Sequence, residues 1–475
     1  MSRRTVPAVL VAGTHRGCGK TTLATGLMGA WRKRGLKVQP YKIGADALET
    51  GYHGLAAGRP STILDLWIMP AKALTSSFAA AAVGADVLVL DGNRGLYDGI
   101  DVEGGPVSTW DVASLLGVPV LLLIDASGMA ESAAAVARGF ATHRQVRLAG
   151  VVLNRVAGPR HYEVLRGAIE KHAGLAVLGY LPPDAGLELP QAGSGLISPE
   201  HIHGGEASLP PLVEKLESTV DLDRLLEVLS PGVPIEPAPP RPEPPGRVRI
   251  GVARDPAFHF YYEDNLTLLK AAGAEIVPFS PMKDTGLPPD IGALYLGGGI
   301  PESCAAVLER NQAMRDEIRA AVKAGMPVYA ESGGMLYLAT NLVGTGIRAW
   351  EMCGVIPGEI RMVARFPAAV YVTAEVAQPT FLTRPGERYR GNEFRISAGS
   401  GELGPAAPWR VCPPGSRQTR PEGYARDGLH ASFVHLHFAS APELPGRFVG
   451  AARAYLMKGG AKKKSRKERQ RSRER

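Results

Sequence analysis

The first residues that could do chemistry form a glycine-rich loop near the start of the chain. The stretch VLVAGTHRGCGKTT, residues 9–22, ends an apolar run in glycines, a lysine and two threonines that begin an amphipathic pattern. Glycines let a backbone wrap around phosphates, a helix N-terminus adds positive potential, and a lysine reaches the β- and γ-phosphate oxygens. The sequence therefore predicts an ATP site, with Thr21 also holding Mg²⁺, that consists of Gly13, Thr14, Gly17, Gly19, Lys20, Thr21 and Thr22.

Acidic residues follow the next apolar runs. The run DVLVLDG ends in Asp91, and the loop GLYDG that comes after it contains Asp98. A carboxylate at the carboxyl end of a parallel strand faces the crevice where nucleotides bind. We therefore expect Asp91 to be a Mg²⁺ ligand and Asp98 to be a catalytic residue.

The segment YKIGADALETGYHG, residues 41–54, follows another predicted strand and contains Lys42, Asp46, Glu49 and His53. Such a loop can face the γ-phosphate across the cleft, which makes Asp46 and Glu49 candidate catalytic residues. Spacing alone leaves a helix-capping or surface role equally open for both. We expect His53 to be a packed or surface histidine rather than a base.

A different kind of site is suggested by PVYAESGGMLYLA, residues 327–339. It is an apolar strand that breaks at Glu331 and then enters an apolar helix. A strand that turns sharply into a helix holds one side chain at the apex, beside unpaired backbone N–H groups. The apex residue is Ser332, although enzymes that take ammonia from glutamine usually have a cysteine there.

The elements that position these residues alternate between short apolar runs and helical patterns. Runs such as AVLVAG, DVLVLDG and VPVLLLIDA precede a proline-rich stretch, and VRIGVAR, IGALYLGGG and MPVYAES follow it. Continuous apolar strands separated by helices indicate parallel sheets covered on both faces. We predict two doubly wound α/β domains, residues 1–230 and 247–457, joined by a semi-rigid linker at 231–246.

Composition limits the remaining possibilities. The chain has 475 residues, of which 45% are hydrophobic, but no uninterrupted apolar run long enough to span a membrane. Its first apolar segment ends in the glycine-rich loop rather than in a cleavage site, so we expect a cytoplasmic protein. The four cysteines have neither metal-binding nor disulfide spacing.

Charge is concentrated at the end of the chain. Residues 458–475 contain ten Lys or Arg and two Glu, which accounts for the whole net charge of +8. We expect a disordered, solvated tail. The alternative is that this tail contacts an acidic partner, such as nucleic acid or an anionic membrane surface.

The order of the motifs resembles that of the cobyrinate a,c-diamide synthase family over about residues 6–455. Before the linker the similar segments are GTHRGCGKTT, GYH, GRPS, GLYDG, STWDVASLLGVPVLLLIDA and GVVLNRV; after it they are LYLGGGIPE, PVYAESGG, GVIPG, GNEF and SFVHLHF. The phosphate loop, in which Gly13 lies six positions before Gly19, matches the longer form found in amidoligases and dethiobiotin synthetase. These motifs are specific as a set.

The resemblance implies an enzyme with two sites. The ATP domain would phosphorylate the a- and c-acetate carboxylates of a corrinoid or related tetrapyrrole, and ammonia would then displace phosphate to form an amide; Asn154 would join the nucleotide site. The second domain would hydrolyse glutamine, with residue 332 as nucleophile, His435 as base, and Gly298 and Gly299 in an oxyanion hole. A homodimer is also an expectation.

Several positions depart from the family pattern. They are Ser332 in place of cysteine, Ala45, Ala47 and Glu49 in place of proline, an aromatic residue and aspartate, Asp91 in place of glutamate, and Gln191-Ala192-Gly193 in place of a charged segment. A serine hydroxyl lacks the acidity and nucleophilicity of a thiol. We therefore predict an inactive or very slow glutaminase, with free ammonia as the other nitrogen source.

Two other functions stay open at this point. One is amidation of a different tetrapyrrole, namely sirohydrochlorin, siroheme or nickel-sirohydrochlorin, because the change at Ala47 alters the substrate loop. The other is a nucleotide- and tetrapyrrole-binding carrier that has lost amidation and docks on a partner through its basic tail. The complete phosphate loop argues against the carrier.

Overall fold

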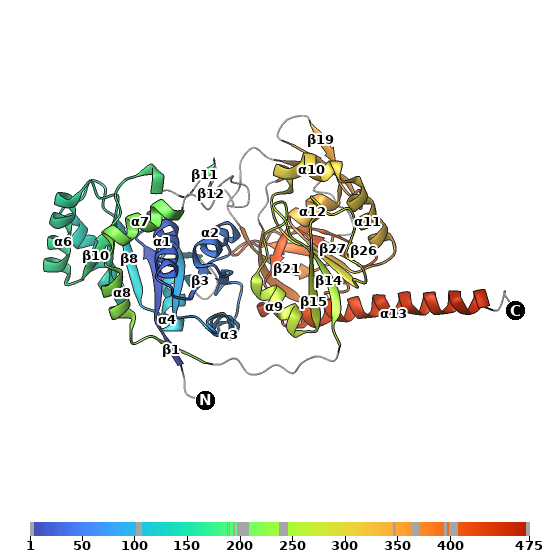
Figure 1. The fold of residues 1–475 in the computed structure, drawn as a ribbon, viewed down its shortest axis with the longest axis horizontal. Helices are drawn as coiled ribbons and strands as arrows, with labels where there is room; N and C mark the ends of the chain where they lie inside the picture. The colour runs from blue at the N-terminus through green and yellow to red at the C-terminus, as the bar shows by residue number, and fades with distance from the viewer. Residues whose placement is uncertain are drawn as a thin grey trace. The chain divides into compact units, whose positions relative to one another are not determined.

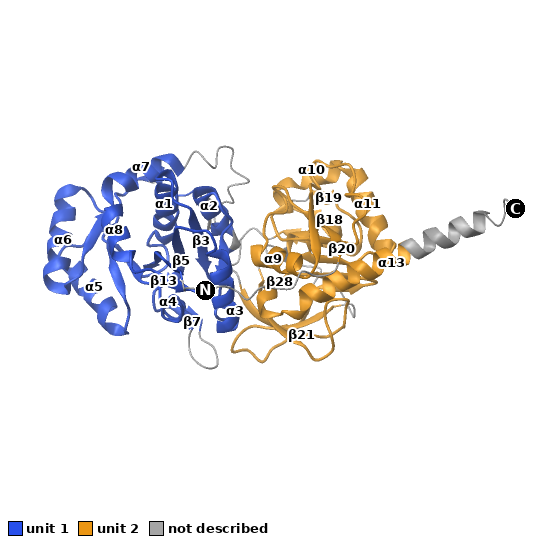
Figure 2. Cartoon of the chain, turned by 60° about the horizontal axis from the view of Figure 1, so that its bottom comes forward, with its two compact units in different colours: residues 1–239 blue, residues 240–475 orange. Residues whose placement is uncertain are grey.

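The protein forms two compact units, residues 1–239 and 240–475 (Figure 2). The structure, a computed structural model, describes residues 4–100, 107–187, 189, 191–192, 195–196, 209–236, 246–344, 348–362, 370–393, 397–398 and 407–471. Each unit has its own sheets and its own apolar core.

The first unit is built on a seven-stranded, wholly parallel sheet with the strand order β10-β9-β8-β2-β5-β3-β4 (Figure 1). Its strands are β2 (Ala8–Gly13), β3 (Val38–Ile43), β4 (Thr62–Leu64), β5 (Val87–Gly95), β8 (Val120–Asp125), β9 (Leu148–Asn154) and β10 (Val177–Tyr180). Its helices are α1 (Lys20–Lys33), α2 (Ala47–Ala57), α3 (Ala71–Ala81), α4 (Thr109–Leu116), α5 (Ser132–His143), α6 (Pro159–Ala173), α7 (Leu209–Thr219) and α8 (Leu222–Leu229), with the 3-10 turn η1 (Ala185–Leu187).

Strand β8 shows why these apolar runs form a parallel sheet. Leu121 and Leu123 pack in a core with α1, α7 and α8, whereas Leu122 and Ile124 pack in a core with α5 and α6. Successive side chains of a strand point to opposite faces, so a strand covered on both faces must be apolar throughout. The predicted doubly wound fold is therefore confirmed for this unit.

Three small pairs of strands complete the first unit. They are β1 (Arg4–Val6) with β13 (Val233–Ile235), β6 (Gly99–Ile100) with β7 (Val107–Ser108), and β11 (Gln191–Ala192) with β12 (Gly195–Leu196). Strand β13 lies inside the predicted linker 231–246, so the first part of that segment belongs to the unit. A proline in a two-stranded edge pair removes no bond from a central strand.

The second unit contains a six-stranded sheet with the order β15-β14-β16-β17-β27-β26, parallel except for β26. Its strands are β14 (Val248–Ala253), β15 (Ala274–Phe279), β16 (Ala293–Leu296), β17 (Val328–Glu331), β26 (Tyr424–Arg426) and β27 (Leu429–Ser432). The helices are α9 (Glu263–Ala271), α10 (Ala305–Arg310), α11 (Gln312–Lys323), α12 (Gly333–Leu338) and α13 (Glu443–Arg471), with the 3-10 turns η4 (Pro301–Cys304) and η6 (Phe438–Ser440).

The second unit also has two sheets that the sequence did not predict. One is an antiparallel sheet of β25 (Arg420–Glu422), β24 (Trp409–Cys412), β21 (Val370–Val376), β22 (Arg388–Glu393) and β28 (Val434–Leu436); the other joins β19 (Ala349–Glu351), β18 (Ala339–Val343), β20 (Ile356–Met362) and β23 (Ser397–Ala398). Residues of β21, β24 and β28 share a core with α9 and α13 on one face of the six-stranded sheet. The expected α/β class is confirmed, but this face is covered partly by strands.

Helix α13 runs to Arg471, through most of the segment that the composition predicts to be disordered. Lysine, arginine, glutamate and alanine all have high helix propensity, which accounts for the difference. None of the described helices combines the length and the apolar character that a membrane crossing requires.

The turn from β17 into α12 is tightly packed. Ser332 has the backbone angles φ 46° and ψ −103°, a combination that residues other than glycine rarely adopt. Helix α12 passes directly over β16, and a Cβ atom on Gly334 would lie 2.1 Å from the carbonyl oxygen of Leu296. Glycine at this position is therefore required for the helix to approach the sheet.

We predict that Gly334→Ala lowers the free energy of unfolding of the second unit by about 1–3 kcal/mol, because the methyl group overlaps a backbone atom that cannot move aside. Urea denaturation of the two proteins measures the change. Gly450→Ala in α13, where a Cβ atom would meet nothing within 4 Å, should instead be neutral or stabilising by up to about 1 kcal/mol. Equal effects of the two changes would contradict the packing argument.

Candidate functional site

The predicted phosphate loop connects β2 to α1 at the carboxyl end of the parallel sheet. Gly17 and Gly19 have positive φ angles, 84° and 100°, so that the loop can wind back before the helix begins. The Lys20 ammonium donates to the carbonyl oxygen of His15 at 3.1 Å, and the Asn154 amide, from the end of β9, donates to that of Cys18 at 2.8 Å. The conformation of the loop is thus stabilised by a hydrogen bond from its own lysine and by a second one from a residue at the end of a neighbouring strand.

The remaining predicted nucleotide residues lie in the same loop. Gly13 ends β2, and a Cβ atom there would lie 2.1 Å from Cys18 Sγ. Thr14 N–H donates to the carbonyl oxygen of Leu123 at 3.2 Å, and Thr21 and Thr22 occupy the first turn of α1. All of the predicted residues are therefore brought to one end of β2, where α1 begins.

A buried ionic network links this loop to the next two strands. Thr21 Oγ1 donates to Glu49 Oε1 at 3.1 Å, and the other oxygen of Glu49 contacts Lys42 Nζ. Lys42 Nζ in turn lies 3.0 Å from Asp91 Oδ2, and His53 Nε2 lies 3.3 Å from the same oxygen. The five side chains come from α1, α2, β3 and β5, so the network ties four elements together at the nucleotide loop.

The charges in this network change one another's protonation. Burial disfavours the charged forms of Lys42 and Asp91, but their mutual attraction outweighs it, so the pKa of Lys42 is raised and that of Asp91 is held well below its usual range. Burial raises the pKa of Glu49 to about 7, and Lys42 offsets this only in part. Asp91 and Lys42 are therefore a fixed ion pair, whereas Glu49 can gain or lose a proton near neutral pH.

The other two predicted acids of this unit have local structural contacts. Asp46 is the N-cap of α2 and accepts from Leu48 N–H at 3.1 Å, which is the capping role that the sequence left open. Asp98 is exposed and accepts from Gly95 N–H at 3.2 Å. His53 is fully buried, as expected for a packed histidine, although its contact with Asp91 was not predicted.

In the second unit, the turn at Ser332 brings three predicted elements together. Ser332 is 4% exposed and donates its N–H to the carbonyl oxygen of Ser432 at 2.7 Å. His435, on β28, has its Nδ1 atom 3.5 Å from Glu331 Oε2. The end of β17 therefore carries a buried carboxylate followed by a serine, and a histidine on β28, a strand of the five-stranded sheet, lies beside that carboxylate. Serine, histidine and carboxylate are the residue set of many acyl hydrolases.

The glycine loop that follows β16 packs against the same turn. A Cβ atom on Gly298 would lie 2.6 Å from His435 Cε1, and one on Gly333 would lie 2.9 Å from the backbone nitrogen of Gly299. The lack of side chains at these glycines therefore lets the loop approach both His435 and the turn after Ser332. However, Gly298 N–H donates to the carbonyl oxygen of Phe260 at 3.1 Å. The predicted use of Gly298 as an oxyanion donor is therefore not met here, because its N–H already has an acceptor.

Sequence reasoning missed the groups that hold Glu331. Its carboxylate is 1% exposed and accepts from the hydroxyls of Tyr295 and Tyr329 at 2.9 and 2.5 Å and from Leu436 N–H at 3.3 Å. Burial raises the pKa of both tyrosines well above the usual value, so both hydroxyls remain protonated donors. The only sequence signal was the position of Glu331 beside the apex serine.

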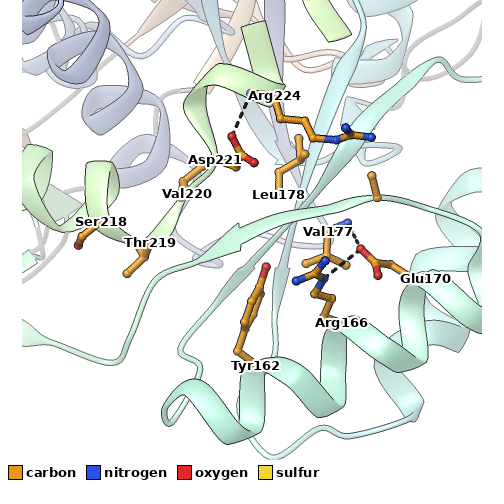
Figure 3. A pocket seen from close by; sticks show the side chains of 11 residues that line it. Tyr162, Arg166, Glu170, Val177, Leu178, Ser218, Thr219, Val220, Asp221 and Arg224 are labelled. Atoms are coloured by element: carbon orange, nitrogen blue, oxygen red, sulfur yellow. Dashed lines mark hydrogen bonds and ion pairs between the residues drawn. The ribbon is translucent and has the colours of Figure 1, made fainter. Parts of the chain in front are cut away.

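A surface pocket of about 520 Å³ lies elsewhere on the first unit, between α6, β10 and the turn from α7 to α8 (Figure 3). Two of its charged lining residues, Arg166 and Glu170, form an ion pair, and Asp221 caps α8 by accepting from the backbone N–H of Arg224. None of the predicted site residues lines this pocket.

Comparison with protein-family models divides the chain into the same two parts. Residues 9–197 match the CobQ/CobB/MinD/ParA nucleotide binding domain, and residues 249–443 match the CobB/CobQ-like glutamine amidotransferase domain. The first match contains the phosphate loop and the ionic network. The second contains Ser332, Glu331 and His435.

Curated relatives match over nearly the whole chain. The cobyrinate a,c-diamide synthase of Salmonella typhimurium is 40% identical over 455 residues, which cover 94% of this chain and 99% of that protein. Enzymes of the same name from Dehalococcoides mccartyi and Listeria monocytogenes are 39% and 36% identical, covering 93% and 90% of this chain and 97% and 96% of their own lengths.

We predict that Lys42→Met destabilises the first unit by about 3–5 kcal/mol, because it leaves the buried carboxylate of Asp91 and the partly buried carboxylate of Glu49 without their cation. Urea denaturation measures the loss. Lys33→Met is the matched control, since Lys33 is 56% exposed in its ion pair with Glu217 and should contribute less than about 1 kcal/mol. A loss for Lys42→Met no larger than that for the control would contradict the network as described.

Proposed function

The chain belongs to the cobyrinate a,c-diamide synthase family, and we propose that it amidates the a- and c-side-chain carboxylates of cobyrinate in cobalamin biosynthesis, with ATP as the activating substrate. The observation that supports this most strongly is the match over 94% of the chain, which includes the nucleotide-binding part and the amidotransferase part together. The protein is thus an ATP-dependent carbon–nitrogen ligase.

The reaction needs two displacements. A carboxylate oxygen of the substrate attacks the γ-phosphorus of ATP, the bond to the bridging oxygen breaks, and ADP leaves. Ammonia then attacks the acyl carbon of the resulting acyl phosphate, the bond from carbon to the phosphate oxygen breaks, and phosphate leaves while nitrogen loses a proton. Without activation a carboxylate is a poor acyl donor, so the first step makes the second feasible.

Lys20 and the loop backbone are the groups that we assign to the phosphoryl transfer. The Lys20 ammonium donates to the carbonyl oxygen of His15, a partner that a phosphate oxygen can replace. Thr14, Gly17, Gly19 and Thr22 would surround the phosphates, and Asn154 would keep the loop in place through Cys18. Charge neutralisation by the lysine would stabilise the transferring phosphoryl group.

The residues present fit Mg²⁺ as the accompanying ion. Asp91 Oδ1 is buried and has no hydrogen-bond partner among the described residues, and Thr21 begins α1 in the same loop. Mg²⁺ takes most of its ligands from phosphates and water, so it does not need a full set of protein ligands. Among the described residues no group of three His, Cys, Asp or Glu could hold a metal by itself. When bound, the ion would neutralise phosphate charge; we assign Thr21 and Asp91 to hold it.

Glu49 and Asp46 are assigned to the substrate side of the site. Glu49 bridges Thr21 and Lys42 and lies at the start of α2, whereas Asp46 fixes where that helix begins. Asp98 would act from the loop after β5, where it accepts from Gly95 N–H. We propose that these acids orient the corrinoid carboxylate, and that Glu49 is the one that also responds to nucleotide binding.

The second unit is assigned to the supply of nitrogen. Its family match is to a glutamine amidotransferase domain, and Ser332 occupies the apex where glutamine would be attacked. The acceptor of the serine proton would be His435, and Gly299 remains the proposed oxyanion donor. Because serine is a weaker nucleophile than cysteine, we propose that free ammonia is the faster nitrogen source for this chain.

We predict that Lys20→Ala removes ATP turnover almost completely, by a factor of at least about 10², because the charge that stabilises the transferring phosphoryl group is lost. Phosphate release with the corrinoid substrate and ammonium chloride measures the rate. Lys33→Ala, also in α1 but on its exposed side, should keep normal turnover. Near-normal turnover of Lys20→Ala would contradict the assignment of this loop.

The proposed function itself is tested by amide formation on cobyrinic acid with Mg-ATP, with glutamine or ammonium chloride as the nitrogen source. Each amide lowers the mass of the product by about one unit, which mass spectrometry resolves. We expect two amides with ammonium chloride, little product with glutamine, and a gain of glutamine use in Ser332→Cys.

The outcomes separate the parts of the proposal. Product with glutamine in the natural protein would show that Ser332 supports glutaminase activity after all. No product from cobyrinic acid with either nitrogen source would contradict the proposed function, and sirohydrochlorin and its metal complexes would then be the next substrates to test.

A further inference from the structure

The immediate surroundings of His435 distinguish its two ring nitrogens. Nδ1 lies 3.5 Å from Glu331 Oε2, while the Nε2 edge faces the glycine loop, since a Cβ atom on Gly298 would come within 3.4 Å of Nε2. That loop packs on Gly333, the residue directly after Ser332. One nitrogen therefore faces a buried carboxylate, and the other faces the glycine loop, which in turn packs on the residue after the serine.

Glu331 cannot easily move away from this position. It is the last residue of β17, it is 1% exposed, and both of its oxygens accept hydrogen bonds, from Tyr295, Tyr329 and Leu436 N–H. Three hydrogen bonds from three different residues fix both oxygens of the group in place. The carboxylate is thus presented to the histidine in one orientation.

We propose that Glu331 is the positioning residue of the glutaminase site: it accepts the Nδ1 proton of His435, which leaves Nε2 unprotonated and directed at residue 332 as the base. The proposal rests on the proposed function of the second unit. It names the third member of a Ser332–His435–Glu331 set, in which the acid lies next to the nucleophile in the chain rather than near the histidine.

Among the described residues, Glu331 is the carboxylate for which a contact with His435 is found. His437 lies two residues further along and has its Nε2 atom 3.7 Å from Asp264 Oδ2, so that acid serves a different imidazole. Burial lowers the pKa of His437, which keeps it neutral. Besides Glu331, which faces His435 directly, the titratable groups next to this pair include Tyr295 and Tyr329, which bond Glu331, and His437 with its neighbours Asp264 and Tyr262.

The role has a chemical consequence for the protonation of residue 332. A carboxylate on Nδ1 stabilises the imidazolium that forms when Nε2 accepts the proton of the nucleophile. In Ser332→Cys the same effect stabilises the thiolate–imidazolium pair and lowers the pH at which the thiol reacts. A purely structural role for Glu331 would change stability without moving that pH.

The first test uses the full-length Ser332→Cys protein and measures alkylation of Cys at 332 by iodoacetamide against pH, by peptide mass spectrometry because the chain has four other cysteines. Adding Glu331→Gln should move the midpoint upward by about one pH unit and slow the reaction at pH 7 by about tenfold. Glu393→Gln is the matched control: Glu393 is 3% exposed and pairs with Arg420, so the midpoint should stay. An unchanged midpoint in Glu331→Gln would overturn the proposal.

The second test needs no variant of Glu331 and so does not depend on whether that variant folds. ¹⁵N NMR of the natural protein, with His435 assigned by comparison with His435→Ala, reports which ring nitrogen carries the proton above the imidazole titration. We expect Nδ1–H and an unprotonated Nε2. An Nε2–H tautomer would overturn the proposal, and neither test requires the protein to form a corrinoid amide, so failure of the proposed function would be seen separately.

Discussion

The buried ammonium group of Lys42 is the interaction on which the nucleotide site depends. It lies between Asp91 on β5 and Glu49 on α2, and Glu49 reaches Thr21 at the start of α1. Charges removed from water are stable only when their partners are also present, so these side chains form a set whose members cannot be lost one at a time. The position of the phosphate loop relative to the next strands therefore follows from a charge balance as much as from apolar packing.

The second unit stabilises a buried carboxylate in a different way. Asp91 has a cation beside it, whereas Glu331 is surrounded by hydroxyl and amide donors. A carboxylate without a fixed cation remains able to attract a proton carried by a nearby imidazole. The two arrangements suit their proposed tasks, since one site must neutralise phosphates and the other must transfer a proton.

Family membership and the departures from the family pattern concern different parts of the molecule. The phosphate loop matches the motif on which the resemblance is based, while the departures expected from that resemblance lie in residues 45–49, at Asp91, in residues 191–193 and at the apex of the β17–α12 turn. The strained backbone at Ser332 and the close approach of Gly334 to β16 are properties of the turn rather than of the side chain at its apex. A serine in place of the cysteine that the resemblance implies would therefore alter the nucleophile and leave its framework in place.

The sequence by itself determined the α/β class, the phosphate loop and the apex serine, because each depends on local spacing: apolar runs, glycines at fixed offsets, and a strand that breaks into a helix. It did not predict the antiparallel sheet of the second unit, since strands such as β21 are buried on one face only and alternate rather than run continuously. The contacts of Lys42 with Asp91 and of Glu331 with His435 join residues 49 and 104 positions apart. Only the tertiary structure could decide them, because charge pairing across strands depends on the order of the strands in the sheet, and local sequence patterns do not contain that order.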